Sequence, residues 1–394
     1  MTPRQRVQFA MGHRAPDRVP VMCQLALGHY FLHSRHAPAD IWFDSDLLAQ
    51  TLRDFCLRYE FDGVLVNLPG RPADWRDRIE RREADAEGER LTWRSGLVTR
   101  CPPDDNPHTF TADGGPLGRA DYARTDPDDP AVFRTDGYVW NTWHAPELFD
   151  LPDLSALAET SAWPDWTTAS LRRTRALLPD HSVHAEVFSP FTHLMELFGY
   201  DQALMALVDA PDLCLALLDR LASVAAAQVT LCAACHADAV LISSAFAGAG
   251  FISRGMYQRF VLPFESRLAA AAHACALPVY THTCGAIGDR LDLLAESGID
   301  GIDTLDPPPL GTVELHEAKA SFGQRLFLKG NLDAVNEMLR ADDGAFRQAV
   351  LDRLRIGKVG SGYILSSACS VAPGVKPERL RLMVELAREY GRYE

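Results

Sequence analysis

Eight short apolar runs alternate with longer stretches of helical periodicity along this chain of 394 residues. Such alternation is typical of repeated βα units, in which helices cover a sheet of parallel strands. Eight units predict an α/β fold of the (β/α)8 TIM-barrel type, with its chemistry on the loops after the strand carboxyl ends. The strands are expected at Val19–Leu25, Gly63–Asn67, Ser182–Phe188, Ala239–Ser243, Val279–His282, Gly301–Thr304, Leu326–Gly330 and Tyr363–Ser366.

The stretches between these runs carry the apolar spacing of amphipathic helices. With the strands they predict a single domain over residues 1–394. The helices are expected at Asp46–Tyr59, Tyr200–Asp209, Pro211–Cys235, Ser253–Cys275, Ala286–Ser297, Thr312–Ser321, Asn336–Ile356 and Lys376–Tyr390.

One segment, residues 69–165, interrupts the alternation with Asp, Arg, Pro, Gly and Trp and has no clean helical period. We interpret it as an insertion after the second strand that lies over the barrel mouth as a lid, because long loops at that end form binding walls. Its residues 91–100 read as a hairpin. For most of the insertion, a surface excursion without a role is an equal alternative. Trp143 and His144 belong to an aromatic run that suits a ligand wall.

The clearest chemical signal is His282-Thr283-Cys284, which ends the fifth predicted strand, together with Cys369 just past the last one. Residues two apart on a strand point the same way, so the imidazole and the thiol face one point. A second thiol from another strand end completes three N and S ligands, the set that catalytic zinc uses with one open position. Buried core thiols with a hydrogen-bonded histidine are the weaker alternative.

A fourth ligand is sought just after the next strand. Asp306 is the favoured candidate, because its carboxylate could hold the resting metal and give way to substrate. Asp303 is the competing candidate, and either residue could instead orient a neighbouring ligand. Two thiolates, an imidazole and a carboxylate make an electron-rich zinc centre, which suits a metal-bound thiolate nucleophile better than hydrolysis.

The composition limits which binding partners and which cellular compartment are expected for the protein. The formal net charge of −14 argues against nucleic acid, whose phosphates need clustered Lys and Arg. No apolar run approaches the length of a membrane span, and no signal peptide is recognised, so a cytoplasmic protein without a membrane partner is expected. In a reducing cytoplasm the nine cysteines favour metal binding or burial over disulfides.

Several blocks of the chain are similar to the uroporphyrinogen decarboxylase superfamily, and within it to the zinc-dependent methyltransferase branch that serves corrinoid systems. The resemblance covers the first strand and nearly everything after about residue 180. It implies a TIM barrel in which His282, Cys284 and Cys369 bind zinc, and the zinc activates a thiol acceptor for a methyl group carried on cobalamin. The blocks are Met1–Val21, Phe251–Phe264, His282–Gly285, Lys329–Asp333 and Tyr363–Ser370.

The chain departs from this family after the first strand. Uroporphyrinogen decarboxylases carry arginines there for the carboxylates of the porphyrinogen, whereas residues 22–30 contain none. Together with the net charge, this disfavours porphyrinogen decarboxylation. The resemblance therefore favours methyl transfer between a cobalamin, free or on a corrinoid protein, and a thiol.

In this hypothesis Glu186 and Asn331 orient a small-molecule substrate, and Tyr30, Trp143 and His144 form pocket walls. For Glu186 a rim charge, and for Asn331 a turn role, are the alternatives. A second hypothesis is a zinc-dependent decarboxylase, lyase or group-transfer enzyme of specialised metabolism. A third is a non-enzymatic module that binds a corrinoid protein and uses zinc structurally. The sequence leaves monomer and homodimer open.

Overall fold

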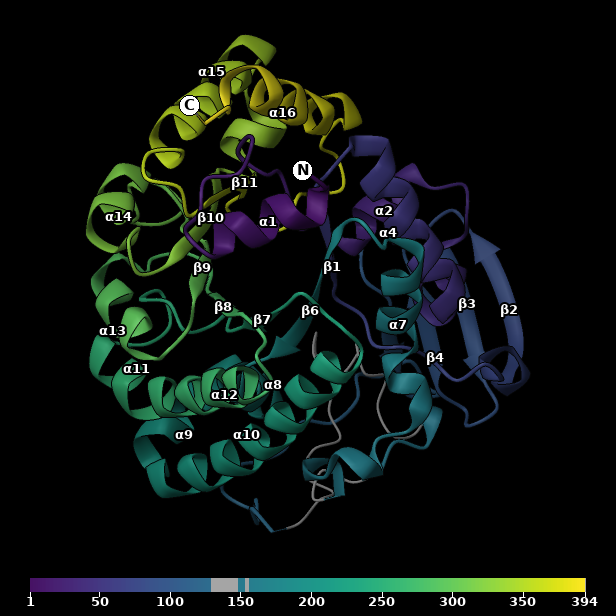
Figure 1. Ribbon diagram of the computed structural model, residues 1–394. Helices are drawn as coiled ribbons and strands as arrows, with labels where there is room; N and C mark the ends of the chain where they lie inside the picture. Colours follow the sequence, from purple (N-terminus) through teal and green to yellow (C-terminus); the bar gives the residue numbers. More distant parts are fainter. Residues whose placement is uncertain (129–147, 153–155, 394) are drawn as a thin grey trace.

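The computed structural model describes residues 1–128, 148–152 and 156–393. Within them, seven parallel strands form one curled sheet in the order β1-β6-β7-β8-β9-β10-β11, with helices around its outside (Figure 1). Seven of the predicted strands are thereby confirmed. Their bounds are β1 Gly63–Val66, β6 Ser182–Phe188, β7 Ala239–Ser243, β8 Val279–His282, β9 Gly301–Thr304, β10 Phe327–Leu332 and β11 Tyr363–Ser367.

The prediction of a regular strand at Val19–Leu25 is wrong in detail. This segment makes isolated bridges from Val21 to Leu365 and from Leu25 to Val371. The Asp62 N–H, just before β1, donates to the Val21 carbonyl, so the segment fills the gap between β1 and β11. Pro20 explains the irregularity, because it has no N–H to give to a ladder.

Helices cover the outer face of the sheet, as the periodicity predicts. The helix expected at Ser253–Cys275 breaks into two at Val261, ahead of Pro263. The bounds are α1 Pro3–Met11, α2 Leu27–His33, α3 Pro38–Phe43, α4 Ser45–Tyr59, α7 Ala169–Leu177, α8 Pro190–Phe198, α9 Tyr200–Asp209, α10 Pro211–Ala234, α11 Arg254–Phe260, α12 Leu262–Ala274, α13 Leu291–Glu296, α14 Leu315–Phe322, α15 Asp343–Gly357 and α16 Pro377–Tyr390.

Two other predicted helices are shorter than expected. The stretch Asn336–Ile356 divides into a π-helical turn and α15, because the Asp342 side chain accepts from the Ala345 N–H and starts a new helix. The stretch Ala286–Ser297 keeps only α13 and a 3-10 turn before it.

The interior of the barrel is closed at one end by an apolar layer, which we call the barrel floor. Helix α1 lies across this end (Figure 1) and contributes three side chains. The others point inward from the surrounding strands. The floor comprises Val7, Ala10, Met11, Met22, Leu65, Ala239, Leu241, Tyr280, Phe327 and Ile364. The strand carboxyl ends, at the opposite end, form the barrel mouth.

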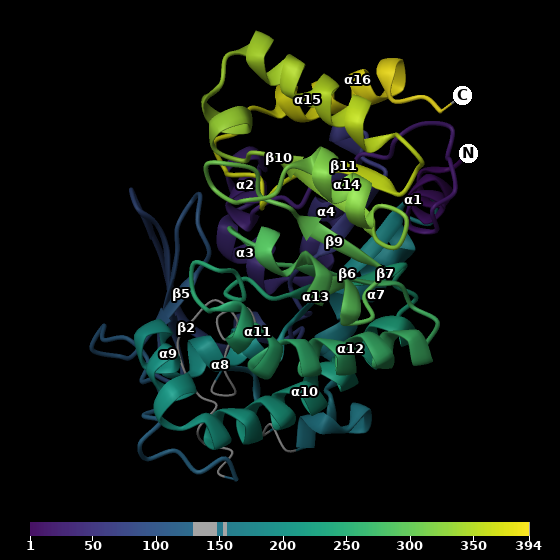
Figure 2. The same ribbon diagram turned by 90° about the vertical axis from the view of Figure 1, so that its left-hand side faces the viewer.

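The insertion folds into an antiparallel sheet of four strands, β2 Ile79–Asp85, β3 Gly88–Trp93, β4 Val98–Cys101 and β5 His108–Phe110. The pairing of β3 with β4 confirms the predicted hairpin. Figure 2 shows this sheet on the side of the molecule opposite α1, which is the mouth side. Asp40 of α3 pairs with Arg82 of β2, and the Ala39 N–H donates to Glu89. The role of this insertion as a lid stays a prediction.

Helix α10 is long and apolar enough to cross a membrane, contrary to the expectation that no run reaches that length. However, 56% of its apolar window is buried inside the fold. It packs against α8, α9 and α12. Such burial is what a core helix requires, because its apolar faces are covered by protein.

A buried ionic cluster joins the chain start to the first strand. Asp62, only 1% exposed, accepts from Arg6 Nη1 at 2.5 Å, from Arg18 Nη1 at 2.9 Å and from the Val21 N–H at 2.8 Å. Removing one partner of such a cluster leaves buried charges without compensation, which costs about 3 to 5 kcal/mol.

Asp62→Ala should therefore lower the free energy of unfolding, measured by urea denaturation, by about 3 to 5 kcal/mol. Asp54→Ala is the matched control, because Asp54 pairs with Arg53 at the surface. That change should stay within about 1 kcal/mol. Equal losses in the two variants would contradict the structural role of the cluster.

Candidate metal centre

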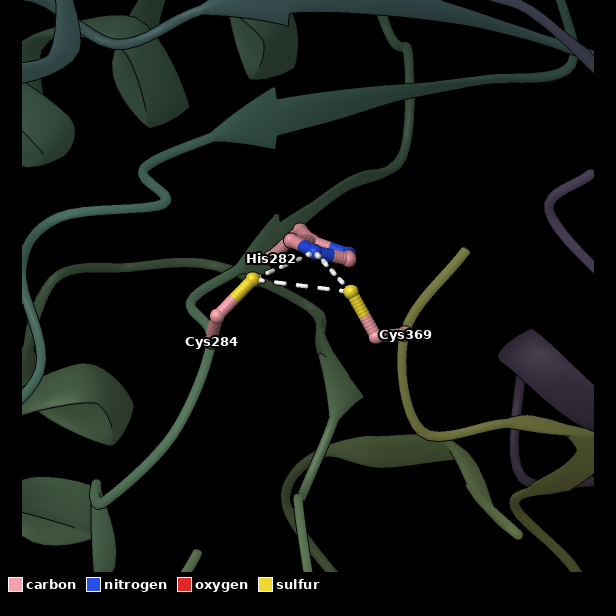
Figure 3. A group of neighbouring side chains, drawn as sticks. All are labelled: His282, Cys284 and Cys369. Atoms are coloured by element: carbon pink, nitrogen blue, oxygen red, sulfur yellow. Dashed lines mark hydrogen bonds between the residues drawn. The ribbon is translucent and has the colours of Figure 1, made fainter. Parts of the chain in front are cut away.

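Three side chains from two distant parts of the sequence meet at the barrel mouth (Figure 3). The Nε2 atom of His282 lies 3.3 Å from the Cys284 sulfur, and the two sulfurs of Cys284 and Cys369 lie 3.7 Å apart. The Cys369 sulfur is 4.0 Å from the same Nε2. Both cysteines are free thiols. We call this group the His-Cys-Cys trio.

The spacing of the trio fits a tetrahedral zinc ion. Zinc binds sulfur at about 2.3 Å and imidazole nitrogen at about 2.05 Å, so tetrahedral angles separate two sulfurs by about 3.8 Å and nitrogen from sulfur by about 3.6 Å. The sulfur–sulfur distance of 3.7 Å agrees, and the nitrogen–sulfur distances of 3.3 and 4.0 Å bracket the expected one. One imidazole and two thiols are also a soft donor set that zinc favours.

The His282 ring is held in the tautomer that a metal requires. Its Nδ1 lies 3.2 Å from Asp303 Oδ2, and since a carboxylate can only accept, Nδ1 carries the proton. Lys329 Nζ donates to the other oxygen, Asp303 Oδ1, at 3.0 Å. All three side chains are buried. A histidine that donates through one nitrogen to a carboxylate presents the other, here Nε2, to a metal.

Local chain geometry explains why Cys284 turns toward Cys369. Strand β8 ends at His282, and Gly285 follows with φ of 78°, a conformation that glycine adopts without strain. Gly248, after β7, packs directly under this turn: a Cβ there would lie 2.7 Å from the Cys284 carbonyl oxygen. The Ala249 N–H donates to the Ala286 carbonyl at 2.7 Å. Gly248 therefore serves a close backbone approach.

The pKa values of the three side chains indicate that they share protons, which a cation could replace. Burial opposes a charge on His282, but hydrogen bonds to Asp303 and Cys369 outweigh it and raise the pKa of His282 to about 10. The Cys284 thiol and the His282 ring hold the pKa of Cys369 well below its usual range. The contact with Cys369, and then burial, raise the pKa of Cys284 well above its usual range. A divalent cation would replace these shared protons.

Asp306 lies close by but has a partner of its own. Its Oδ2 accepts from the Gly285 N–H at 2.6 Å, which fixes the turn after Cys284. Burial raises the pKa of Asp306 to about 6, against the lowering effect of that N–H. Among the described residues, the group close enough to share one ion is the trio alone. Asp306 as a displaceable fourth ligand stays a prediction, and Asp303 takes the orienting role.

The interior just above the floor is polar on every strand. Side chains alternate along a strand, so the next inward positions lie two residues beyond the floor positions. On β6 and β9 the floor level is marked by His184, which bonds Tyr280, and by Gly301, which lies against the Phe327 ring. We call the layer above the polar ring. Its members are Gln24, Asn67, Glu186, Ser243, His282, Asp303, Lys329 and Ser366.

Glu186, predicted to orient substrate, belongs to this ring. Its carboxyl hydrogen-bonds with Ser243 and lies close enough to feel the charges of His282 and Cys369. Burial raises the pKa of Glu186 to about 7. Its Oε2 is out of contact with solvent and has no hydrogen-bond partner among the described residues. The carboxyl is thus placed beside the trio, while its part in a reaction stays a prediction.

The remaining predicted site residues have different surroundings. Asn331, on β10 two positions past Lys329, donates to the Leu305 carbonyl at 2.8 Å, and its buried Oδ1 has no partner within the described chain. Tyr30 is packed in the main core, edge to face against Phe55, so its surroundings give no support to a pocket wall. Trp143 and His144 lie outside the described residues.

Comparison with known proteins identifies the relatives of this chain. A family model described as uroporphyrinogen decarboxylase (URO-D) matches residues 145–390. The uroporphyrinogen decarboxylase of Tolumonas auensis is 28% identical over 186 residues, 46% of this chain and 49% of that protein. That of Alkalilimnicola ehrlichii is 28% identical over 194 residues, 48% of this chain and 50% of that protein. The chain spans about half the length of the curated relatives it matches.

A solved structure matches the fold over nearly the whole chain. It is a methyltransferase from Methanosarcina mazei, with a TM-score of 0.68 and 16% identity, covering 99% of this chain and 98% of that one. At this identity the likeness establishes a shared fold. It confirms the predicted barrel architecture.

Glu186→Gln tests the environment of the buried carboxyl through pH. The pKa of Glu186 is about 7 in the folded chain against 4.5 for the free group, so the folded state binds this proton more tightly. Its contribution to stability is complete below about pH 4.5 and is lost as the pH rises through about 7. In metal-free protein, raising the pH from about 5 to about 8 should lower the free energy of unfolding of the wild type by about 1 to 3 kcal/mol more than that of Glu186→Gln.

Urea denaturation at each pH measures this difference. Parallel pH profiles for the two proteins would show that the Glu186 carboxyl is not held in its neutral form by burial.

Proposed function

The chain belongs to the uroporphyrinogen decarboxylase family, and we propose that within it the protein is a zinc-dependent methyltransferase that moves a methyl group between a cobalamin or corrinoid carrier and a thiol. The observation that carries the proposal is the His-Cys-Cys trio with its oriented imidazole at the barrel mouth. The mouth is where TIM barrels hold their chemistry.

The donor set decides which chemistry a bound metal would supply. A zinc ion held by His282, Cys284 and Cys369 supplies a soft Lewis acid that deprotonates a thiol near neutral pH and leaves its sulfur nucleophilic. The chain's own residues prepare this site: Asp303 keeps the His282 proton on Nδ1, and Lys329 balances the charge of Asp303. A thiol would take the fourth position of the metal, which is either open or held at rest by the displaceable Asp306 carboxylate.

Porphyrinogen decarboxylation is less well supported, although the curated relatives carry that name. A substrate with many carboxylates needs fixed cations. The polar ring contains no arginine, and its one lysine, Lys329, already bonds Asp303. This agrees with the absence of arginine from residues 22–30.

Two alternatives retain the zinc. A zinc-dependent decarboxylase, lyase or group-transfer enzyme would use the metal to polarise a substrate oxygen, and the family name favours this class next. A corrinoid-binding module would use zinc only as a structural link and would close the site with a fourth protein ligand. Both differ from the proposal in what happens to the metal when a thiol arrives.

Serine substitutions test the ligand assignment. Cys284→Ser and Cys369→Ser should each reduce zinc affinity by more than the roughly 10- to 100-fold that loss of an orienting group costs. Asp303→Asn should fall within that 10- to 100-fold range, because it leaves the ligands in place. Cys275→Ser, at an exposed free thiol, is the matched control and should bind zinc normally.

Zinc content after dialysis against a competing chelator measures the effect. Full zinc retention in either the Cys284 or the Cys369 variant would rule the assignment out.

X-ray absorption at the zinc edge tests the reaction class. Adding a small thiol to the zinc-loaded protein should raise the sulfur count around the metal from two to three, since the thiol takes the open position. A methyltransferase acting on thiols requires this change. An unchanged spectrum with four protein ligands would support the structural module instead, and an added oxygen ligand only would support the alternative enzyme class.

A further inference from the structure

The polar ring divides into two parts that differ in their hydrogen bonding. On one side His282, Asp303 and Lys329 satisfy one another. On the other side, besides the Ser366 hydroxyl, three acceptor atoms are shielded from solvent and have no partner among the residues that the structure describes. They are Gln24 Oε1, Asn67 Oδ1 and Glu186 Oε2. Natural proteins rarely leave buried acceptors unpaired, because each costs about 1 to 3 kcal/mol.

These three residues stand next to one another around the barrel. Strands β1 and β6 pair with Val66 opposite Ala185, which places Asn67 beside Glu186. The segment that carries Gln24 lies between β1 and β11. We call Gln24, Asn67 and Glu186 the acceptor arc. Gln24 and Asn67 are 7% and 6% exposed.

The acceptor arc reaches the metal centre at Glu186. That carboxyl lies close enough to His282 and Cys369 for their charges to act on it. Cys284, Cys369 and Glu186 are each partly exposed, while the floor beneath them is closed. A molecule that enters from the mouth and places one atom on the trio would extend its other end toward Glu186, the member of the arc on which the charges of the trio act.

The charged side chains around the trio are mostly acidic. Glu186 lies on β6, Asp303 on β9 and Asp306 in the loop after β9, and Lys329 is the one lysine of the polar ring. The amides of Gln24 and Asn67 can turn to present either oxygen or nitrogen. The pKa of Glu186, raised by burial to about 7, lets this carboxyl ionise near neutral pH, and the carboxylate can then only accept a hydrogen bond. Among the described residues of the polar ring, an anionic group would meet only Lys329, which already bonds Asp303, whereas an ammonium group would meet three acceptors.

From this geometry, and resting on the proposed function, we propose that the thiol substrate carries an ammonium group a few bonds from its sulfur, which the acceptor arc binds while the sulfur occupies the metal. The arc thus selects the substrate class: cationic thiols first, neutral hydroxyl or amide thiols next, and anionic thiols last. Asn67 and Gln24 supply hydrogen bonds, and Glu186 supplies both a hydrogen bond and the charge preference.

Three thiols of equal chain length test the selection. Cysteamine, 2-mercaptoethanol and 2-mercaptoethanesulfonate differ only in carrying a cationic, a neutral or an anionic end. Each is titrated into the cobalt(II)-substituted protein, and the thiolate-to-cobalt charge-transfer band reports binding. We expect cysteamine to bind at least about tenfold more tightly than the sulfonate, with the alcohol between them.

Variants of the acceptor arc distinguish recognition of the ammonium group from binding of the thiol sulfur to the metal. Glu186→Gln keeps the shape and removes the charge, so the ratio of cysteamine to sulfonate affinity should fall at least about fivefold. Asn67→Ala should lower the affinity for cysteamine about tenfold, and it provides a second test of the arc if Glu186→Gln does not fold. Glu385→Gln, at an exposed position on α16, removes the same charge on the outside of the barrel and should leave the affinities for all three thiols unchanged.

The outcomes keep this inference apart from the proposed function. If all three thiols alter the cobalt band but the sulfonate binds as tightly as cysteamine, or Glu186→Gln leaves the ratio unchanged, the ammonium selection is overturned and thiol binding stands. If no thiol alters the band, the proposed function fails. The thermal unfolding midpoint, measured with propylamine or with propanesulfonate, then tests ammonium binding by the acceptor arc separately. A rise with the amine that is lost in Glu186→Gln supports ammonium binding. Equal effects of the amine and the sulfonate overturn it.

Discussion

The Asp303 carboxylate, shared between His282 and Lys329 inside the barrel, is the contact on which the site depends. Burial alone would favour its neutral form, yet Lys329 and His282 hold the pKa of Asp303 below its ordinary value. The charged carboxylate in turn fixes the proton of His282 on Nδ1. Nε2 is thereby left to face the two sulfurs, and this buried ionic contact orients a group that could hold one soft cation.

The barrel can bury these charged side chains because apolar and polar layers alternate along each strand. The floor excludes water at the α1 end, and the next inward level is polar on every strand. Polar side chains at this level either pair with one another, as Asp303 does, or face the open mouth. The unpaired acceptors of Gln24, Asn67 and Glu186 follow one another around the barrel as far as the metal trio.

Much of the fold could be predicted because seven strands follow local apolar runs. The His-Cys-Cys trio could also be predicted, since its members end strands that a barrel brings together. Lys329, Gln24 and Asn67 were missed as site residues, because their importance appears only once the inward face of each strand is known. The prediction of a regular strand at Val19–Leu25 was wrong because Pro20 has no N–H to donate to a ladder. The contact of Tyr30 with Phe55 arises from tertiary packing, which no local sequence pattern reveals.

The central claim is that one divalent ion joins two thiolates and an imidazole at the mouth of the barrel. Diffraction from crystals of the zinc-loaded protein, collected on both sides of the zinc absorption edge, tests it most directly. The account predicts a single anomalous peak about 2.3 Å from both sulfurs and about 2.05 Å from His282 Nε2. The absence of a peak there, or a peak bound to other residues, would contradict it.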